Sequence, residues 1–200
     1  MRPAAGEVLH FSEDPTIATF RPHVAATSLE RTPYVWAVGY DRAPDYWFPR
    51  QCPRAMAWVG TSTTAVDQLS IIGPGGGTRV HAIEYGWLNP LRTTELYAYR
   101  LPAAAFVQAE AAVVATSEVV PLGPPERVGN LYDLHAEAGI QLRVLPNLHA
   151  FWDAVITSTL EFSGIRLRNA RPRPSDPSPD SEAAATSGDL GHVPGTSDKK

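Results

Sequence analysis

Short apolar runs separated by turn-forming residues dominate the chain as far as about residue 165, and they predict a series of short strands. Several runs are rich in β-branched and aromatic residues, which favour strands. The predicted strands are Val8–Phe11, Tyr34–Val38, Ala55–Val59, Arg79–Tyr85, Glu95–Leu101 and Ile140–Leu145, with shorter ones around Phe106, Val113 and Val119.

Helical patterns fall irregularly between these strands. We expect helices at Glu126–Ala138, which Gly139 ends, and from Leu148 to about Glu161, where Asn147 is the predicted cap. A short helix capped by Ser62 or Thr63 is expected before Leu69, and a helical turn within 41–48. Strands in runs with irregularly placed helices indicate an α+β fold with a mixed, largely antiparallel sheet.

The composition changes sharply near residue 170. All 18 aromatic residues lie at or before Phe162, whereas 171–200 is rich in Pro, Ser and Asp. Such a segment cannot bury enough apolar surface to offset its chain entropy. We therefore predict a single globular domain over 1–170 and a disordered tail over 171–200.

Charge and cysteine content exclude some classes of protein. The formal net charge of -4 argues against a protein that binds nucleic acid through bulk positive charge. Cys52 is the one cysteine, so there is no internal disulfide, and no Cys/His cluster has the spacing of a zinc site. No signal peptide or membrane span is predicted, so we expect a cytoplasmic protein without a membrane partner.

The segment 48–54 places Cys52 between two prolines and two arginines. Nearby positive charge can lower the pKa of a thiol, which makes Cys52 a candidate nucleophile; the alternative is a small buried thiol. A rigidly held Arg50 suits the recognition of phosphate or carboxylate, and a structural salt bridge is its alternative.

Two further candidates lie on predicted strands. His10 precedes the polar turn that starts at Ser12, a suitable place for contact with a ligand, although many strand histidines are structural. Glu84 shares a strand face with Val80 and Ala82, so it is either buried or directed into a cleft, unless the position is an exposed edge.

Other features carry weaker signals. The glycine-rich segment 73–77 lacks the spacing of phosphate-binding loops and is expected to be a flexible connector. The sequence around His135 does not match a zinc-binding helix, so no metal is assigned. The basic run of Arg166, Arg168, Arg171 and Arg173 is interpreted as a solvated linker, with contact to nucleic acid as the alternative.

Four stretches in this order carry a family resemblance: 9–15 (LHFSEDP), 35–37 (VWA), 47–54 (WFPRQCPR) and 160–165 (LEFSGI). They resemble a family of bacterial proteins described only as a domain of unknown function. The resemblance extends over roughly residues 8–170.

The opening strand, the loop after it and the strand with Val35-Trp36-Ala37-Val38 are also similar to the start of ADP-ribosyltransferase-like folds. That resemblance implies NAD or a related nucleotide as ligand, with His10 as the ribose contact and Ser12 assisting. It implies that Glu84, or else Glu161, would steady the charge of an oxocarbenium-like transition state during ADP-ribosyl transfer or hydrolysis, while Arg50 holds a phosphate.

Two other hypotheses stand beside this one. In the first, the protein is a non-catalytic binding or interaction module in which Arg50, Arg54 and neighbouring aromatic residues recognise an anionic ligand or a protein partner. In the second, the chemistry depends on Cys52, which then has to react readily with an alkylating reagent near neutral pH.

Overall fold

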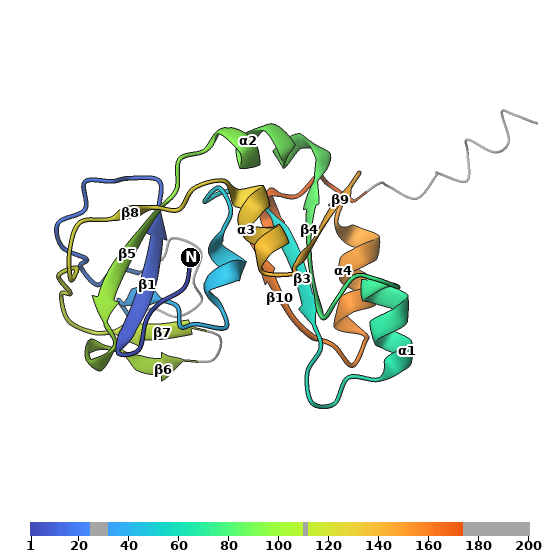
Figure 1. Ribbon diagram of the computed structural model, residues 1–200, viewed down its shortest axis with the longest axis horizontal. Helices are drawn as coiled ribbons and strands as arrows, with labels where there is room; N and C mark the ends of the chain where they lie inside the picture. Colours follow the sequence, from blue (N-terminus) through green and yellow to red (C-terminus); the bar gives the residue numbers. More distant parts are fainter. Residues whose placement is uncertain (25–31, 110–111, 174–200) are drawn as a thin grey trace, which may run out of the picture.

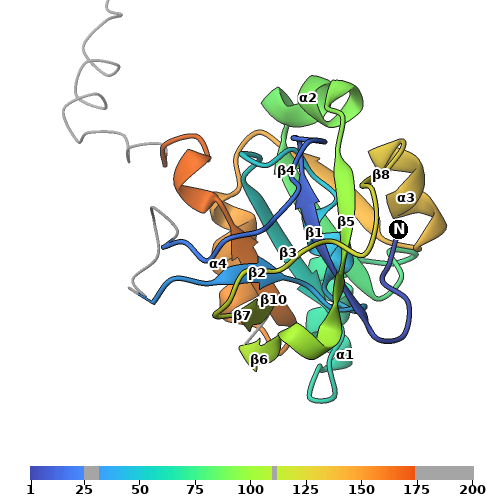
Figure 2. The same cartoon turned by 90° about the vertical axis from the view of Figure 1, so that its left-hand side faces the viewer.

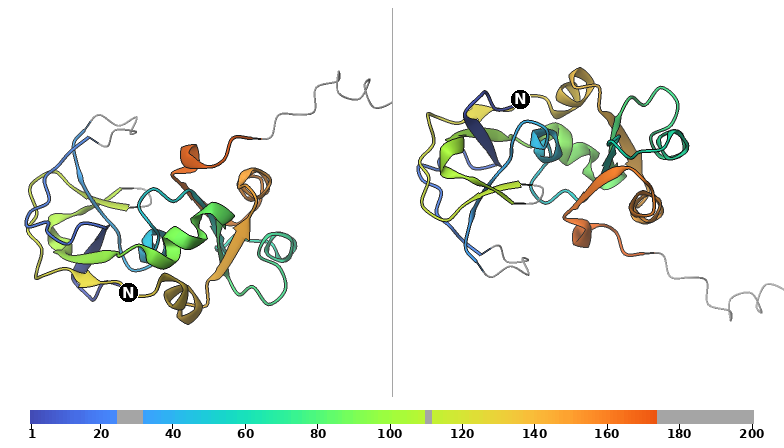
Figure 3. Two further views of the ribbon diagram at one scale, coloured as in Figure 1. Left: turned by 90° about the horizontal axis from the view of Figure 1, so that it is seen from above. Right: turned by 90° about the horizontal axis from the view of Figure 1, so that it is seen from below.

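The structure is a computed structural model, and it describes residues 1–24, 32–109 and 112–173. The strands of these residues form two groups that lie side by side, with the turn η1 (Ala43–Tyr46) between them (Figures 1 and 3). The predicted α+β fold with mixed, largely antiparallel pairing is confirmed. The predicted tail lies outside the described residues beyond Arg173.

The first group contains two small antiparallel sheets. One has the order β1-β5-β8 and consists of β1 (Glu7–Ser12), β5 (Tyr97–Pro102) and β8 (Glu126–Arg127). The other has the order β2-β7-β6 and consists of β2 (Val35–Ala37), β7 (Ala112–Ala115) and β6 (Val107–Ala109). Figure 2 shows β1 and β5 running along each other, and their register pairs His10 with Tyr99.

The second group is one sheet with the order β10-β3-β4-β9. Its strands are β3 (Arg54–Trp58), β4 (Arg79–Glu84), β9 (Gln141–Leu145) and β10 (Glu161–Ile165). Strands β4 and β9 pair in parallel, and the other strands of this sheet pair antiparallel. Both faces of β4 are buried because the sheet has cover on each side.

Helices cover the two faces of this second sheet (Figure 1). The helices are α1 (Ala65–Asp67), which continues into the π-helix η2 (Gln68–Ile72), α2 (Leu88–Thr93), α3 (Leu131–Glu137) and α4 (His149–Ile156); the other 3-10 turns are η3 (Tyr85–Trp87), η4 (Ala103–Ala105) and η5 (Leu167–Asn169). Helix α4 packs against β3 and β10 on the outer face, and α3 packs against β9 on the side that faces the first group. None of the described helices is long and apolar enough to span a membrane.

Three predicted boundaries are wrong. Helix α3 starts after Asn130, whose side chain accepts hydrogen bonds from its first turn, because Gly129 has a φ of 90° that stops a helix from extending backwards. Helix α4 ends at Ile156, and Glu161 belongs to strand β10 instead. Helix α1 is capped by Thr64, whose side chain accepts a hydrogen bond from the backbone of Asp67.

A buried polar chain links the second sheet to the helix that covers its inner face. The Nδ1 atom of His135 lies 2.7 Å from the carbonyl oxygen of Leu131, which can only accept, so this nitrogen carries the proton. Nε2 of His135 therefore accepts from Nδ1 of His81 at 3.1 Å, and Nε2 of His81 accepts from Nε of Arg79 at 2.9 Å. Both imidazoles are thus neutral, and Arg79 also forms an ion pair with the buried carboxylate of Asp45.

Candidate functional site: a basic pocket between the sheets

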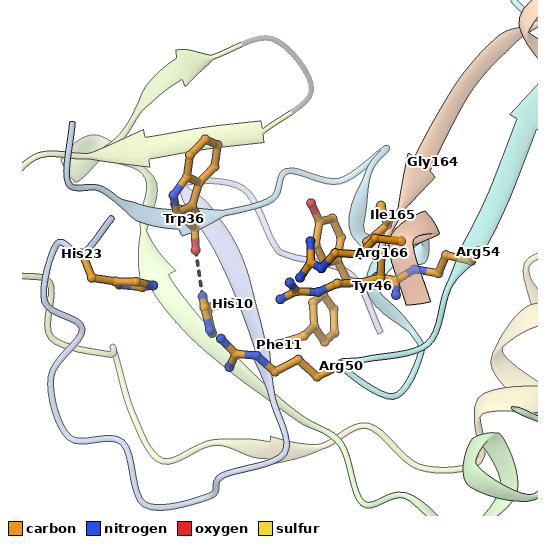
Figure 4. A pocket seen from close by; sticks show the side chains of 11 residues that line it. His10, Phe11, His23, Trp36, Tyr46, Arg50, Arg54, Gly164, Ile165 and Arg166 are labelled. Carbon is orange, nitrogen blue, oxygen red and sulfur yellow. Dashed lines mark hydrogen bonds between the residues drawn. The ribbon is translucent and has the colours of Figure 1, made fainter. Parts of the chain in front are cut away.

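A pocket of about 370 Å³ lies between the two groups of strands (Figure 4). Residues of both groups line it, and they are mostly basic or aromatic. The lining residues are His10, Phe11, His23, Trp36, Tyr46, Arg50, Arg54, Gly164, Ile165, Arg166 and Arg168. Its volume falls within the range that is usual for small-molecule sites.

His10 lies on one side of the pocket in strand β1. Its Nδ1 atom donates to the carbonyl oxygen of Trp36 at 2.7 Å, since a carbonyl can only accept. Burial lowers the pKa of His10, so the neutral form is favoured and Nε2 is an acceptor. Nε2 has no hydrogen-bond partner among the described residues, and it is available to a ligand hydroxyl or N–H.

Arg50 lies in the loop between η1 and β3. Its backbone N–H donates to the side chain of Glu13 at 2.7 Å, which ties this loop to the turn after β1. Its guanidinium is exposed and makes no ion pair or hydrogen bond with any residue that the structure describes. Figure 4 shows it directed toward His10. The structure thus places Arg50 and His10, two of the predicted site residues, in the same pocket.

Arg54, Arg166 and Arg168 form the opposite side. Arg54 is 3% exposed at the start of β3, and its Nε and Nη1 atoms donate to the carbonyl oxygens of Asp45 and Cys52 at 2.7 and 2.9 Å. Arg166 and Arg168 follow β10, and Figure 4 shows the side chain of Arg166 directed into the pocket. The interpretation of 166 and 168 as part of a solvated linker is therefore wrong.

The backbone at Arg166 is unusual. Its φ of 56° is in the left-handed region, the one such value among the described non-glycine residues. This conformation costs free energy in a residue with a Cβ atom, and such strain is concentrated at functional sites. At this position the turn takes the chain from β10 into η5 and leaves the guanidinium beside the pocket.

The electrostatics of the pocket are one-sided. None of the described residues that line it carries a carboxylate. Burial and the neighbouring charges of Arg168 and Arg50 lower the pKa of Arg166, and burial lowers the pKa of Arg54. Positive charges that oppose one another around a partly enclosed space favour the binding of an anion.

Two other predicted site residues lie outside this pocket. Ser12 is buried at the end of β1, and its hydroxyl accepts a hydrogen bond from the backbone of Asp14 at 3.1 Å, which stabilises the turn. Glu84 is 3% exposed, and its carboxylate accepts the backbone N–H of Arg171 at 3.0 and 3.2 Å. The structure therefore does not bring Glu84 together with His10 and Arg50.

Cys52 lacks the properties of a nucleophile. It is fully buried, and burial raises the pKa of its thiol to about 12 despite the neighbouring Arg54. The thiol points toward the carbonyl oxygen of Pro53 at 3.5 Å. The described residues also contain no group of three or more His, Cys, Asp or Glu side chains that could hold a metal ion.

The fold and the pocket define a small α+β protein with a basic, aromatic-lined cavity between two groups of strands. The model of a family of unknown function (DUF6886) matches residues 9–170, and the chain belongs to this family. No curated protein and no solved structure matches the chain. The family resemblance found in the sequence is thus confirmed, whereas the resemblance to ADP-ribosyltransferase-like folds gains no support.

Proposed function

We propose that the protein binds a nucleotide in the pocket between its two groups of strands. The observation that carries this proposal is that arginine side chains without a carboxylate partner among the described residues surround a cavity that also has aromatic walls. Guanidinium groups recognise phosphate through paired hydrogen bonds, and aromatic rings supply a surface for a base.

His10 gives the proposal a second polar contact. Because its Nδ1 proton is held by the carbonyl of Trp36, Nε2 presents a lone pair to the pocket. A ribose hydroxyl is a suitable donor to this atom. NAD and related nucleotides contain both the hydroxyl and the phosphate groups that these side chains select.

The proposal is one of binding rather than of ADP-ribosyl transfer. Glu84, the carboxylate that the hypothesis of transfer requires, is occupied by the backbone of Arg171 outside the pocket. A module that binds an anionic ligand needs the arginines of the pocket but no catalytic carboxylate. The net charge of -4 argues against bulk binding of nucleic acid.

Calorimetric titration of the full chain with ADP, ADP-ribose and NAD tests this proposal. We expect saturable binding of at least one of them and its loss in His10→Ala, with Arg127→Asn as a control because Arg127 pairs with Glu95 away from the pocket. Absence of heat with all three ligands in the folded wild type overturns the proposal. Equal affinity in His10→Ala removes His10 from it.

A further inference from the structure

The arginine side of the pocket carries more positive charge than the protein neutralises. Arg54 is buried, and its guanidinium donates to two backbone carbonyls and lies over the rings of Tyr46 and Phe48. No described carboxylate forms an ion pair with it. The nearest candidate, Asp45, already pairs with Arg42 and Arg79. A buried charge without a counter-charge is costly, so an anion bound beside Arg54 would remove that cost.

Three more guanidinium groups face the same space without a partner among the described residues. These groups belong to Arg50, Arg166 and Arg168, which two separate segments of the chain bring together. All three line the same pocket. Burial lowers the pKa of Arg166, and the neighbouring charges of Arg168 and Arg50 lower it further. The strained backbone at Arg166 is a further cost of keeping this arrangement.

We infer that this arginine cluster, Arg50, Arg54, Arg166 and Arg168, binds the terminal diphosphate of a nucleoside diphosphate. The inference deepens the proposed function and rests on it. The terminal phosphate of a nucleoside diphosphate is substituted through one oxygen only, so it carries about two negative charges near pH 7, as a phosphomonoester does. It also leaves three oxygens free for guanidinium forks. The diphosphate of NAD is esterified at both of its ends, so each of its phosphates offers fewer free oxygens and less charge to the same cluster.

The remaining walls of the pocket suit the nucleoside part. Nε2 of His10 is an open acceptor, and the aromatic residues Phe11, Trp36 and Tyr46 are part of the lining of the pocket. Because His10 is on β1 and Arg166 follows β10, the two ends of the ligand would contact different groups of strands (Figure 4). The ligand class is thus defined by a diphosphate at one end and a ribose with a base at the other.

The test compares the affinities of ADP, AMP, ADP-ribose and pyrophosphate for the full chain by calorimetry at fixed salt. We expect ADP to bind about tenfold or more tightly than AMP and ADP-ribose, as is typical for one added set of charge-assisted hydrogen bonds. We also expect ADP to bind more tightly than pyrophosphate, because pyrophosphate lacks the nucleoside.

Two variants assign the effect to the cluster. Arg166→Asn keeps a residue that tolerates left-handed backbone while it removes the guanidinium, and Arg168→Gln changes an exposed side chain. Each should weaken ADP binding about tenfold and reduce its salt dependence, whereas Arg127→Asn should change neither.

The outcomes separate this inference from the proposed function. If AMP or ADP-ribose binds as tightly as ADP, the inference on the terminal diphosphate is refuted while nucleotide binding stands. Pyrophosphate that binds as tightly as ADP refutes the nucleoside part. If none of the nucleotides binds, the proposed function fails and the inference fails with it. Unchanged ADP affinity in both folded arginine variants refutes the role of the cluster.

Discussion

Acidification from pH 7 to pH 5 is expected to destabilise the protein through the buried histidines His81 and His135. Burial lowers the pKa of His135 from 6.5 to about 4. Burial also lowers the pKa of His81, and the neighbouring His135 and Arg79 lower it further. Each ring already uses one nitrogen as an acceptor in the chain from Arg79 to Leu131. Protonation of either ring would place a donor against a donor at a site where both side chains are buried.

The sign of the effect follows from these lowered pKa values. As the pH falls below 6.5, the unfolded chain takes up protons at these histidines while the folded protein does not, so stability is lost until the folded pKa is reached. For His135 alone, the difference between pKa 6.5 and about 4 gives a loss of about 2 kcal/mol at pH 5. His81 acts in the same direction, whereas Asp45 opposes it because burial raises its pKa.

Urea denaturation at pH 7, 6 and 5 in wild type and His135→Gln measures this contribution. Circular dichroism is the appropriate signal, because the ring of Trp47 lies 5.8 Å from that of His135 and its fluorescence would report local protonation. The variant lacks the titrating group, so its free energy of unfolding should decrease less than that of wild type when the pH is lowered from 7 to 5. The difference between the two decreases should be about 2 kcal/mol. Parallel profiles for the two proteins would refute the argument that His135 is neutral and buried.

Three other changes have defined outcomes. Cys52 should resist iodoacetamide in the native protein near pH 7 and react after denaturation, as mass spectrometry of the alkylated chain would show; rapid native labelling contradicts its raised pKa of about 12. Glu84→Gln should leave ADP affinity in calorimetry unchanged, since Glu84 is outside the pocket; a tenfold loss would place it in the site. Gly76→Ala should destabilise the protein by roughly 1–3 kcal/mol in urea denaturation, because a Cβ atom there would lie 2.7 Å from the carbonyl oxygen of Ile72. A neutral result at Gly76 would show that the loop is the flexible connector expected from its sequence.

The strands could be predicted because their signal is local. Strands β1, β3 and β4 coincide with the apolar runs of the sequence to within a residue or two, since a short apolar run between turn-forming residues is enough to locate them. Helix ends were predicted less well. The start of α3 depends on the positive φ of Gly129, which the pattern of hydrophobic positions does not reveal. Glu161, which was expected to end a helix, lies in β10 because it pairs with Trp58 of β3.

The candidate site could be predicted in part. His10 and Arg50 stood out by their local chemistry, and both line the pocket. Glu84 also stood out, and its burial follows from the strand face that it shares with Val80 and Ala82. Its partner, the backbone of Arg171, comes from a distant segment, so the sequence did not reveal that its carboxylate is occupied.

Arg166 and Arg168 show why a site of this kind is hard to find from local patterns. A basic run next to a polar tail has the composition of a linker, and only the pairing of β10 with β3 brings it beside Arg54 and Arg50. The informative signal is therefore a relation between distant segments: two arginine-containing stretches whose charges have no acidic counterpart where the fold joins them. Positive charges that face one another without a counter-charge cost free energy of folding. A phosphorylated ligand is the partner that would offset this cost.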